Sequence, residues 1–138
     1  MDTAADEYEQ FVRARTPALL RTAYLLTGDQ QHAEDLVQEA LARTHLSWHR
    51  LHSTGNADAY ARKIMYHRQV SMWRRRRVTE SLPGTLPDAA ASADHAHATA
   101  VRVALHRALL ELSPRQRAVI VLRYYEDRTE AETADILG

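Results

Sequence analysis

Hydrophobic side chains recur at helical spacing through the first half of the chain. A stripe beginning at Phe11 predicts a helix over residues 9–26, and Gly28 is placed to end it. A second helix is expected over residues 30–48. A polar loop, residues 52–56, then leads to a third helix over residues 57–77. The members of the first stripe are Phe11, Ala14, Ala18, Thr22, Leu25 and Leu26.

The second half shows the same periodicity with clearer helix boundaries. Ser113 followed by Pro114 and Gln116 has the pattern of a capping box with proline at the first helical position. Thr129 and Glu132 form a second such pattern, and the short helix that they open is expected to stop at Gly138. The apolar stripe ahead of Ser113 comprises Val101, Ala104, Leu105, Ala108, Leu109 and Leu112, and the one after it comprises Val119, Ile120, Leu122 and Tyr124.

Between these halves, residues 78–98 have a different composition. Pro83, Gly84 and Pro87 interrupt any helix, and large apolar residues are few. The 138-residue chain is therefore predicted to be all-α, with two small helical modules, residues 1–77 and 99–138, joined by a flexible linker over residues 78–98.

The predicted second helix has two contrasting faces. Leu36, Ala40, Thr44 and Trp48 share one side, and at 100° per residue Asp35, Gln38, Glu39 and Ala42 fall on the other. The polar side is either a docking surface for a basic partner or an ordinary solvated face. The pattern alone leaves both interpretations open.

Charge is distributed unevenly although the net charge is zero. Residues 59–77 contain seven Lys/Arg and no acid, while the rest of the chain is acidic on balance. Such a stripe attracts a phosphate backbone. Tyr60, Tyr66 and Trp73 lie among these cations, and aromatic rings can stack on unpaired bases. The alternative is a solvated helix end with Tyr60, Ile64 and Met65 as packing residues.

Composition excludes several other classes of protein. There is no Cys, so disulfides and thiolate metal sites are absent, and no motif for a cofactor or catalytic centre is present. His95 and His97 in the linker are not accompanied by a carboxylate cluster, so no metal site is expected there. His45, His49 and His52 are spaced close to one helical face, but His52 is expected to lie past the helix end, so this spacing is interpreted as coincidence. The acidic N-terminus does not resemble a secretory signal and no stretch could span a bilayer. We therefore expect a cytoplasmic protein without membrane insertion.

Three segments resemble the sigma factors of RNA polymerase, specifically the extracytoplasmic-function type of the sigma-70 superfamily. They are AEDLVQEAL over residues 33–41, LSPRQR over residues 112–117 and YYE over residues 124–126. They occur in the family's order, with the basic aromatic segment and the linker between them. The resemblance implies a transcription initiation factor and not an enzyme.

The resemblance also implies roles for particular residues. Asp35, Gln38 and Glu39 would grip the coiled coil of the clamp in the polymerase's largest subunit. The basic segment would recognise and melt the minus-ten promoter element, although His67 stands where many relatives carry Asn. Ser53, Thr54 and Asn56 would belong to a base-capturing loop over residues 51–58. The implied DNA-binding residues are Arg62, Lys63, Tyr66, His67, Arg68, Trp73, Arg74, Arg75, Arg76 and Arg77.

In the family, the second module contains a helix-turn-helix that reads the minus-thirty-five element. Here the supporting helix is present but the recognition helix that should follow Gly138 is not. We therefore expect a chain truncated within this motif, with Ile136 and Leu137 left without a packing partner. The alternative is a natural variant that does not read the upstream element. The polymerase flap is a further contact of this module in relatives.

The predicted function is binding to core RNA polymerase and promoter DNA, with recognition and melting of the minus-ten element. An anti-sigma protein wedged between the modules is the regulator that the resemblance implies. One alternative is an interaction module that occupies polymerase without opening DNA. Another, a histidine-dependent nuclease, rests only on the eight His residues.

Overall fold

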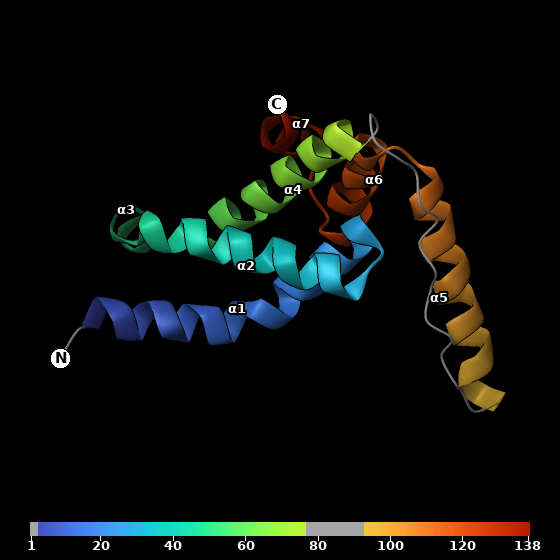
Figure 1. Cartoon of the computed structure of the whole chain (residues 1–138), viewed down its shortest axis with the longest axis horizontal. Helices are drawn as coiled ribbons and strands as arrows, with labels where there is room; N and C mark the ends of the chain where they lie inside the picture. Colours follow the sequence, from blue (N-terminus) through green and yellow to red (C-terminus); the bar gives the residue numbers. More distant parts are fainter. Residues whose placement is uncertain (1–2, 77–92) are drawn as a thin grey trace.

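In the computed structural model, the backbone is described for residues 3–76 and 93–138, and the side chains for residues 3–71 and 96–138. This part of the chain is helical throughout, apart from short turns, and contains no strand (Figure 1). The all-α prediction is confirmed. Most of the linker predicted over residues 78–98 lies outside the described residues, but helix α5 already begins at Ala93.

Helices α1 (Thr3–Thr27) and α2 (Gln30–Leu46) form an antiparallel pair joined by a tight turn. Helix α1 begins six residues before the predicted residue 9, so the prediction placed its start too late. Pro17 lies inside the helix, as the predicted range required. Gly28, with φ of 71°, ends α1 as expected. Asp29 then caps α2, because its carboxylate accepts a hydrogen bond of 2.8 Å from the backbone N–H of His32.

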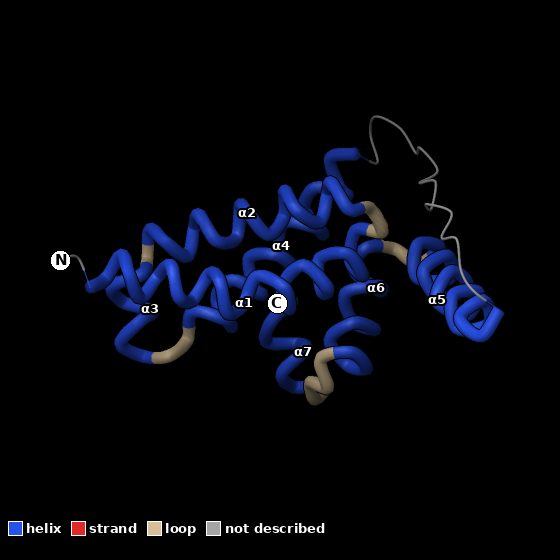
Figure 2. The backbone as a smooth tube through the Cα atoms, turned by 90° about the horizontal axis from the view of Figure 1, so that it is seen from below, coloured by secondary structure: helices blue, strands red, loops and turns tan. Residues whose placement is uncertain are grey.

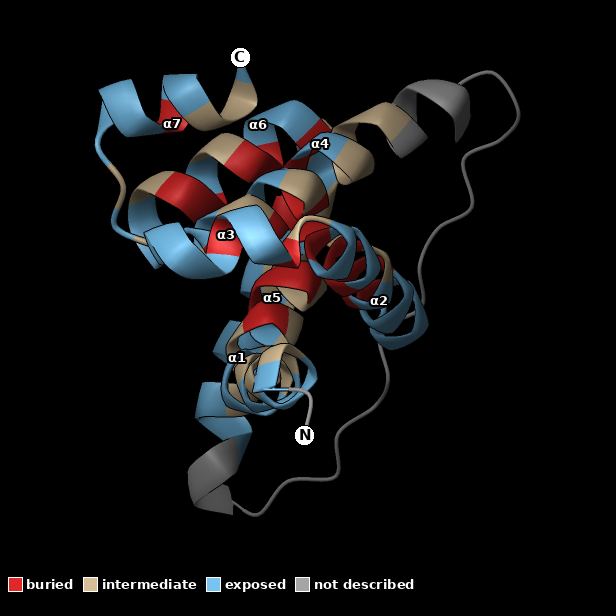
Figure 3. Ribbon diagram, turned by 90° about the vertical axis from the view of Figure 1, so that its left-hand side faces the viewer, coloured by how far each residue is buried: buried red, intermediate tan, exposed pale blue. Residues whose placement is uncertain are grey.

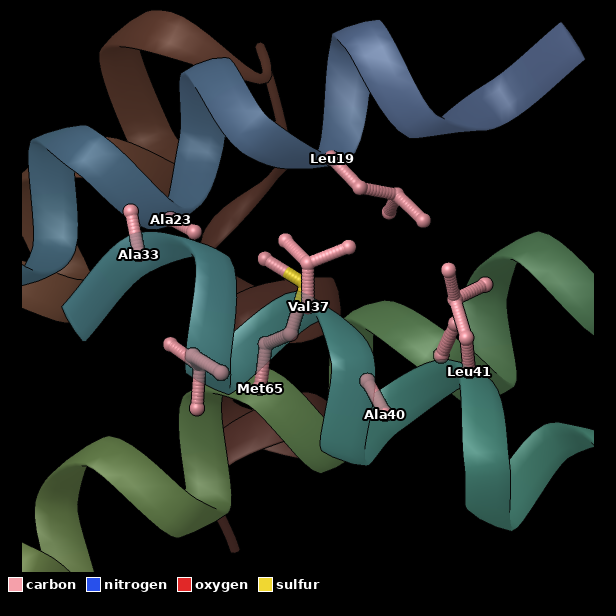
Figure 4. Close-up of a cluster of buried hydrophobic side chains, with 9 residues drawn as sticks. Leu19, Ala23, Ala33, Val37, Ala40, Leu41 and Met65 are labelled. Atoms are coloured by element: carbon pink, nitrogen blue, oxygen red, sulfur yellow. The ribbon is translucent and has the colours of Figure 1, made fainter. Parts of the chain in front are cut away.

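Helix α4 (Ala57–Arg76) completes the first module and matches the predicted third helix closely. Its Ala61 and Met65 are fully buried against α1 and α2, and the small residues Ala23, Ala33 and Ala40 allow close helix approach (Figure 4). This packing joins α2, which carries the predicted polar face, and α4, which carries the predicted basic segment, through one shared core. The core cluster comprises Leu19, Ala23, Ala33, Leu36, Val37, Ala40, Leu41, Ala61 and Met65.

A short helix, α3 (Trp48–Thr54), occupies much of the segment where a loop was predicted. Trp48 anchors it, because its ring lies 5.4 Å from the rings of both Tyr8 and Phe11 on α1. Gly55, with φ of 70°, ends the helix. Only the turn between α3 and α4 is therefore loop.

The second module consists of α5 (Ala93–Glu111), α6 (Pro114–Ile120), a π-helical turn η1 (Val121–Tyr125) and α7 (Glu130–Leu137). Both predicted capping boxes are present, at Ser113 with Gln116 and at Thr129 with Glu132. The helix after Ser113 was expected to bury Ile120 and Tyr124, but the wider π turn leaves both exposed and buries Val121 and Leu122.

Helix α5 extends away from the other helices and meets them only near its C-terminal end (Figures 1 and 2). The apolar stripe predicted on it is therefore only partly used. Leu109 is buried, but Val101 and Leu105 are each 54% exposed.

The two modules pack directly against each other. Leu26 and Tyr66 of the first module form one buried cluster with Ala118, Val121 and Leu122 of the second. Ile136 and Leu137 pack against the same cluster, so the expectation that they have no packing partner was wrong. Buried residues accordingly continue from α1, α2 and α4 into α6 (Figure 3).

Candidate nucleic-acid interface

The polar face of α2 lies where the helical pattern predicted it. Asp35 and Gln38 are exposed, while Leu36, Val37 and Ala40 point into the core. Asp35 accepts a hydrogen bond of 3.0 Å from Gln31 one turn earlier on the same exposed side. This face can therefore be reached by a partner without any change in the core.

Glu39 differs from its two neighbours on that face, because it is bound within the chain. Its carboxylate lies 2.5 Å from the guanidinium of Arg68 on α4 and 3.8 Å from that of Arg43 on α2. Glu39 therefore connects the predicted polymerase-binding face to the predicted DNA-binding helix. The sequence did not indicate this pairing.

Arg62 and Lys63, adjacent in sequence, have opposite environments. Lys63 is exposed, whereas the Arg62 side chain is only 15% exposed and lies between two carboxylates. Arg62 Nε donates to Asp58 at 2.8 Å, and its Nη1 donates to Glu126 at 2.6 Å. Burial alone would lower the pKa of Arg62, but the hydrogen bonds and negative charges of Asp58 and Glu126 outweigh it and raise the pKa.

Tyr66 and His67 also contact the second module. Tyr66 is fully buried, and burial, reinforced by the nearby charge of Glu126, raises the pKa of its hydroxyl far above the ordinary value. His67 is exposed, and its Nε2 lies 2.6 Å from the carbonyl oxygen of Ile136. Both residues also line a pocket between α4, α6 and α7, together with Val70, Ser71, Arg115 and Leu137.

The remaining predicted DNA-binding residues are at the end of α4. The helix backbone extends through Arg76, but the side chains of Trp73, Arg74, Arg75 and Arg76, and all of Arg77, lie outside the described residues. Arg68, the last described cation of the segment, is the partner of Glu39.

The predicted base-capturing residues are divided between a helix and a turn. Ser53 and Thr54 belong to the last turn of α3, where their hydroxyls donate to the carbonyl oxygens of Arg50 and Leu51. Asn56 lies in the turn before α4, and its carbonyl oxygen accepts from the backbone N–H of Tyr60. All three are exposed, although only Asn56 is in the loop that was expected.

Sequence reasoning missed the polar residues that join the modules. Glu126 accepts from Arg62 and, at 2.9 Å, from Thr22 Oγ1. Arg117 is buried, and its guanidinium donates to the carbonyl oxygens of Leu26 at 2.6 Å and Leu109 at 2.8 Å. Burial lowers the pKa of Arg117. No local signal distinguishes these residues, because their partners are distant in sequence.

Neither a metal site nor a membrane span is found in the described part of the chain. No group of three or more His, Asp or Glu residues there could hold a metal ion. None of the helices there is both long and apolar enough to cross a membrane.

Each of the two modules matches a known protein family. Residues 11–79 match the family model for sigma-70 region 2, and residues 100–138 match that for sigma-70 region 4. The RNA polymerase sigma-E factor of Streptomyces antibioticus is 42% identical over 96% of this chain and 73% of its own length. That of Streptomyces coelicolor is 40% identical over 96% of this chain and 74% of its own length. The ECF RNA polymerase sigma factor SigL of Mycobacterium tuberculosis is 32% identical over 87% and 70%.

An all-helical chain with these two matched regions in this order is a transcription initiation factor and not an enzyme. It belongs to the sigma-70 family of RNA polymerase sigma factors, and to the extracytoplasmic-function type within it. Membership in this family implies core RNA polymerase and promoter DNA as partners.

Proposed function

We propose that this chain anchors to the clamp of core RNA polymerase through Asp35, Gln38 and Glu39, and that α4 recognises and melts the minus-ten element. The observation that carries the proposal is the packing of α2, with Asp35 and Gln38 exposed, against a helix whose segment 59–77 contains seven Lys/Arg and no acid. Docking of α2 would then fix where α4 meets DNA.

The clamp contact can be tested by measuring binding of the chain to purified core polymerase. Asp35→Ala combined with Gln38→Ala should weaken binding at modest ionic strength. Asp6→Ala is the matched control, because it also removes one exposed carboxylate but from a different helix, α1. Equal affinity of the double variant and wild type would remove this face from the interface. Glu39 is left intact because it also pairs with Arg68.

Minus-ten recognition by α4 can be tested with DNA templates whose promoter sequence is not known in advance. A pool of templates with a pre-melted bubble and randomised minus-ten positions can be selected with the chain bound to core polymerase. Enrichment of a defined minus-ten sequence, and run-off transcription from it, is expected. A selection without enrichment would contradict minus-ten recognition.

One observation favours the second candidate, an interaction module that binds polymerase without opening DNA. Arg62, Tyr66 and His67 are in contact with the second module and not free for DNA. Such a module would bind core polymerase normally but give no run-off product, even from a pre-melted bubble.

The proposal includes two further contacts that the family suggests. Exposed Ile120, Tyr124 and Tyr125 offer an apolar patch to the polymerase flap. An anti-sigma protein inserted between the modules would have to replace the Arg62–Glu126 contact. The flap contact predicts that Tyr124→Ala co-purifies with the isolated flap less well than the wild-type chain. The regulator contact predicts that the whole chain co-purifies with a candidate anti-sigma protein.

A further inference from the structure

Helix α3 depends on other helices for its position. It has only seven residues, and a helix of that length is not stable by its own hydrogen bonds. Ser47, at its N-cap, makes no side-chain hydrogen bond to the first turn. The place of α3, and of the turn that leads from it into α4, must therefore be set by contacts with the surrounding helices.

Most of these contacts come from the N-terminal part of α1, which lies at the same end of the molecule as α3 (Figures 1 and 2). The ring of Trp48 meets Tyr8 edge-on and Phe11 at a tilt, each with ring centroids 5.4 Å apart. The hydroxyl of Tyr8 donates to the carbonyl oxygen of Leu41 on α2 at 2.7 Å. The start of α1 is thus fixed to α2 and forms the support on which α3 packs.

One polar contact holds the last turn of α3 to the same support. Nε2 of His52 lies 2.7 Å from the carboxylate of Glu7 on α1. The His52 ring also stacks on Trp48, with centroids 5.2 Å apart and an angle of 25° between the planes. A further contact runs to α4, where the guanidinium of Arg50 lies over the ring of Tyr60 at 5.7 Å. The end of α3 is therefore held from both α1 and α4.

Glu7 and Tyr8 lie before residues 11–79, the part of the chain that matches sigma-70 region 2. Two of the residues that support α3 are therefore outside the matched region. Their contribution to the turn after α3 is a property of this chain's own N-terminal segment.

Asn56, in the turn that this support positions, is well suited to recognise a base. Ser53 and Thr54 use their hydroxyls as donors to carbonyl oxygens of their own helix. Asn56 presents an exposed side-chain amide, which has both hydrogen-bond donors and an acceptor. Its backbone joins the turn to α4, because its carbonyl oxygen accepts from the N–H of Tyr60 at 2.9 Å. A shift of the turn would move this amide relative to bound DNA.

We propose that Glu7 is a positioning residue for single-stranded DNA: through His52 it holds α3 so that the Asn56 amide meets the edge of one unpaired base. Glu7 itself does not touch DNA. A turn that is already in place loses less conformational freedom when the base binds, so the contact increases discrimination at that one base. This inference rests on the proposed recognition of the minus-ten element.

The test uses the chain bound to core polymerase and the pool of pre-melted templates with randomised minus-ten positions. Asn56→Ala should remove the base preference at one position. Glu7→Ala should reduce the preference at that same position about two- to fivefold, the range expected for a partly exposed contact, and leave other positions unchanged. Glu9→Ala is the matched control, because Glu9 is an exposed carboxylate of α1 whose partner, Arg13, lies on the same helix.

The double variant Glu7→Ala/Asn56→Ala separates positioning from a general effect on structure. It should lose no more preference at that position than Asn56→Ala alone, because Glu7 acts only through the placement of Asn56. A general weakening of the fold would lower binding at every position and add to the loss in Asn56→Ala. Glu7→Ala that selects like wild type, loses preference uniformly or loses it at a different position from Asn56→Ala overturns the inference. If wild type enriches no sequence, minus-ten recognition itself fails.

A reversible covalent link provides an independent arm. The chain contains no Cys, so Glu7→Cys with His52→Cys can be joined specifically by a short reducible bis-maleimide. The linked form should regain the wild-type preference, and the reduced form should resemble Glu7→Ala. Equal preferences in the two forms, or failure of the reagent to join the two positions, contradicts the positioning role. Urea unfolding of each form verifies folding, and the comparison of linked with reduced protein decides the outcome if Glu7→Ala unfolds.

Discussion

The guanidinium of Arg68 on α4 lies 2.5 Å from the carboxylate of Glu39 on α2. The face proposed for polymerase and the helix proposed for DNA therefore share an ion pair. A partner that bound Glu39 would compete with Arg68 for the same carboxylate, which would link the two proposed interfaces through one contact. A variant of Glu39 would therefore change the contact between α2 and α4 as well as the proposed polymerase-binding face, whereas variants of the exposed Asp35 or Gln38 would not.

The Glu39–Arg68 pair should contribute modestly to stability. The two side chains are 31% and 32% exposed, so solvent screens the interaction. A double-mutant cycle of Glu39→Gln and Arg68→Gln, followed by urea unfolding, should give a coupling free energy of about 0.5–1 kcal/mol. A coupling near zero would mean that the pair does not hold α2 and α4 together.

Arg117 should be much more important for stability. Its buried guanidinium donates to backbone carbonyl oxygens near the ends of α1 and α5. Arg117→Met should lower the free energy of unfolding by roughly 2–4 kcal/mol, because buried carbonyl groups are left unpaired. Arg107→Met is the control on an exposed position of α5 and should change stability by less than about 0.5 kcal/mol. Similar decreases for both variants would contradict this assignment.

His106 should make stability depend on pH. Its ring lies 4.8 Å from that of Tyr24, and burial lowers the pKa of His106 below its ordinary value of 6.5. The unfolded chain therefore takes up this proton at a higher pH than the folded chain, and stability falls as pH drops below about 6.5. Urea unfolding between about pH 5.5 and pH 8 should show a smaller slope for His106→Gln than for wild type, whereas the exposed His49→Gln should leave the contribution intact. An unchanged slope in His106→Gln would contradict the prediction.

The Arg run at residues 74–77 should govern the salt dependence of DNA binding. Replacing all four with Ala should weaken binding and reduce the log–log salt slope by roughly 0.9 for each duplex phosphate that is no longer neutralised. A slope equal to that of the parent would place this run outside the DNA interface.

Features that depend on nearby residues were predictable from the sequence. The capping boxes at Ser113 and Thr129 involve partners three positions away, and the two faces of α2 follow from helical periodicity. The same reasoning placed Asp35 and Gln38 on an exposed surface. It misplaced Ser53 and Thr54, because the packing of Trp48 on α1 stabilises a helix that its own seven residues would not predict.

The order of residues was enough to establish that the chain is helical, where most helices begin and end, and that the cations concentrate on one segment. These properties follow from backbone propensity, capping and charge, which act within a few residues. The folded arrangement was needed to show that Glu126 pairs with Arg62, that Arg117 joins α1 to α5, and that Tyr66 is core and not surface. Those outcomes depend on the packing of two modules, because burial brings together groups that no local pattern relates.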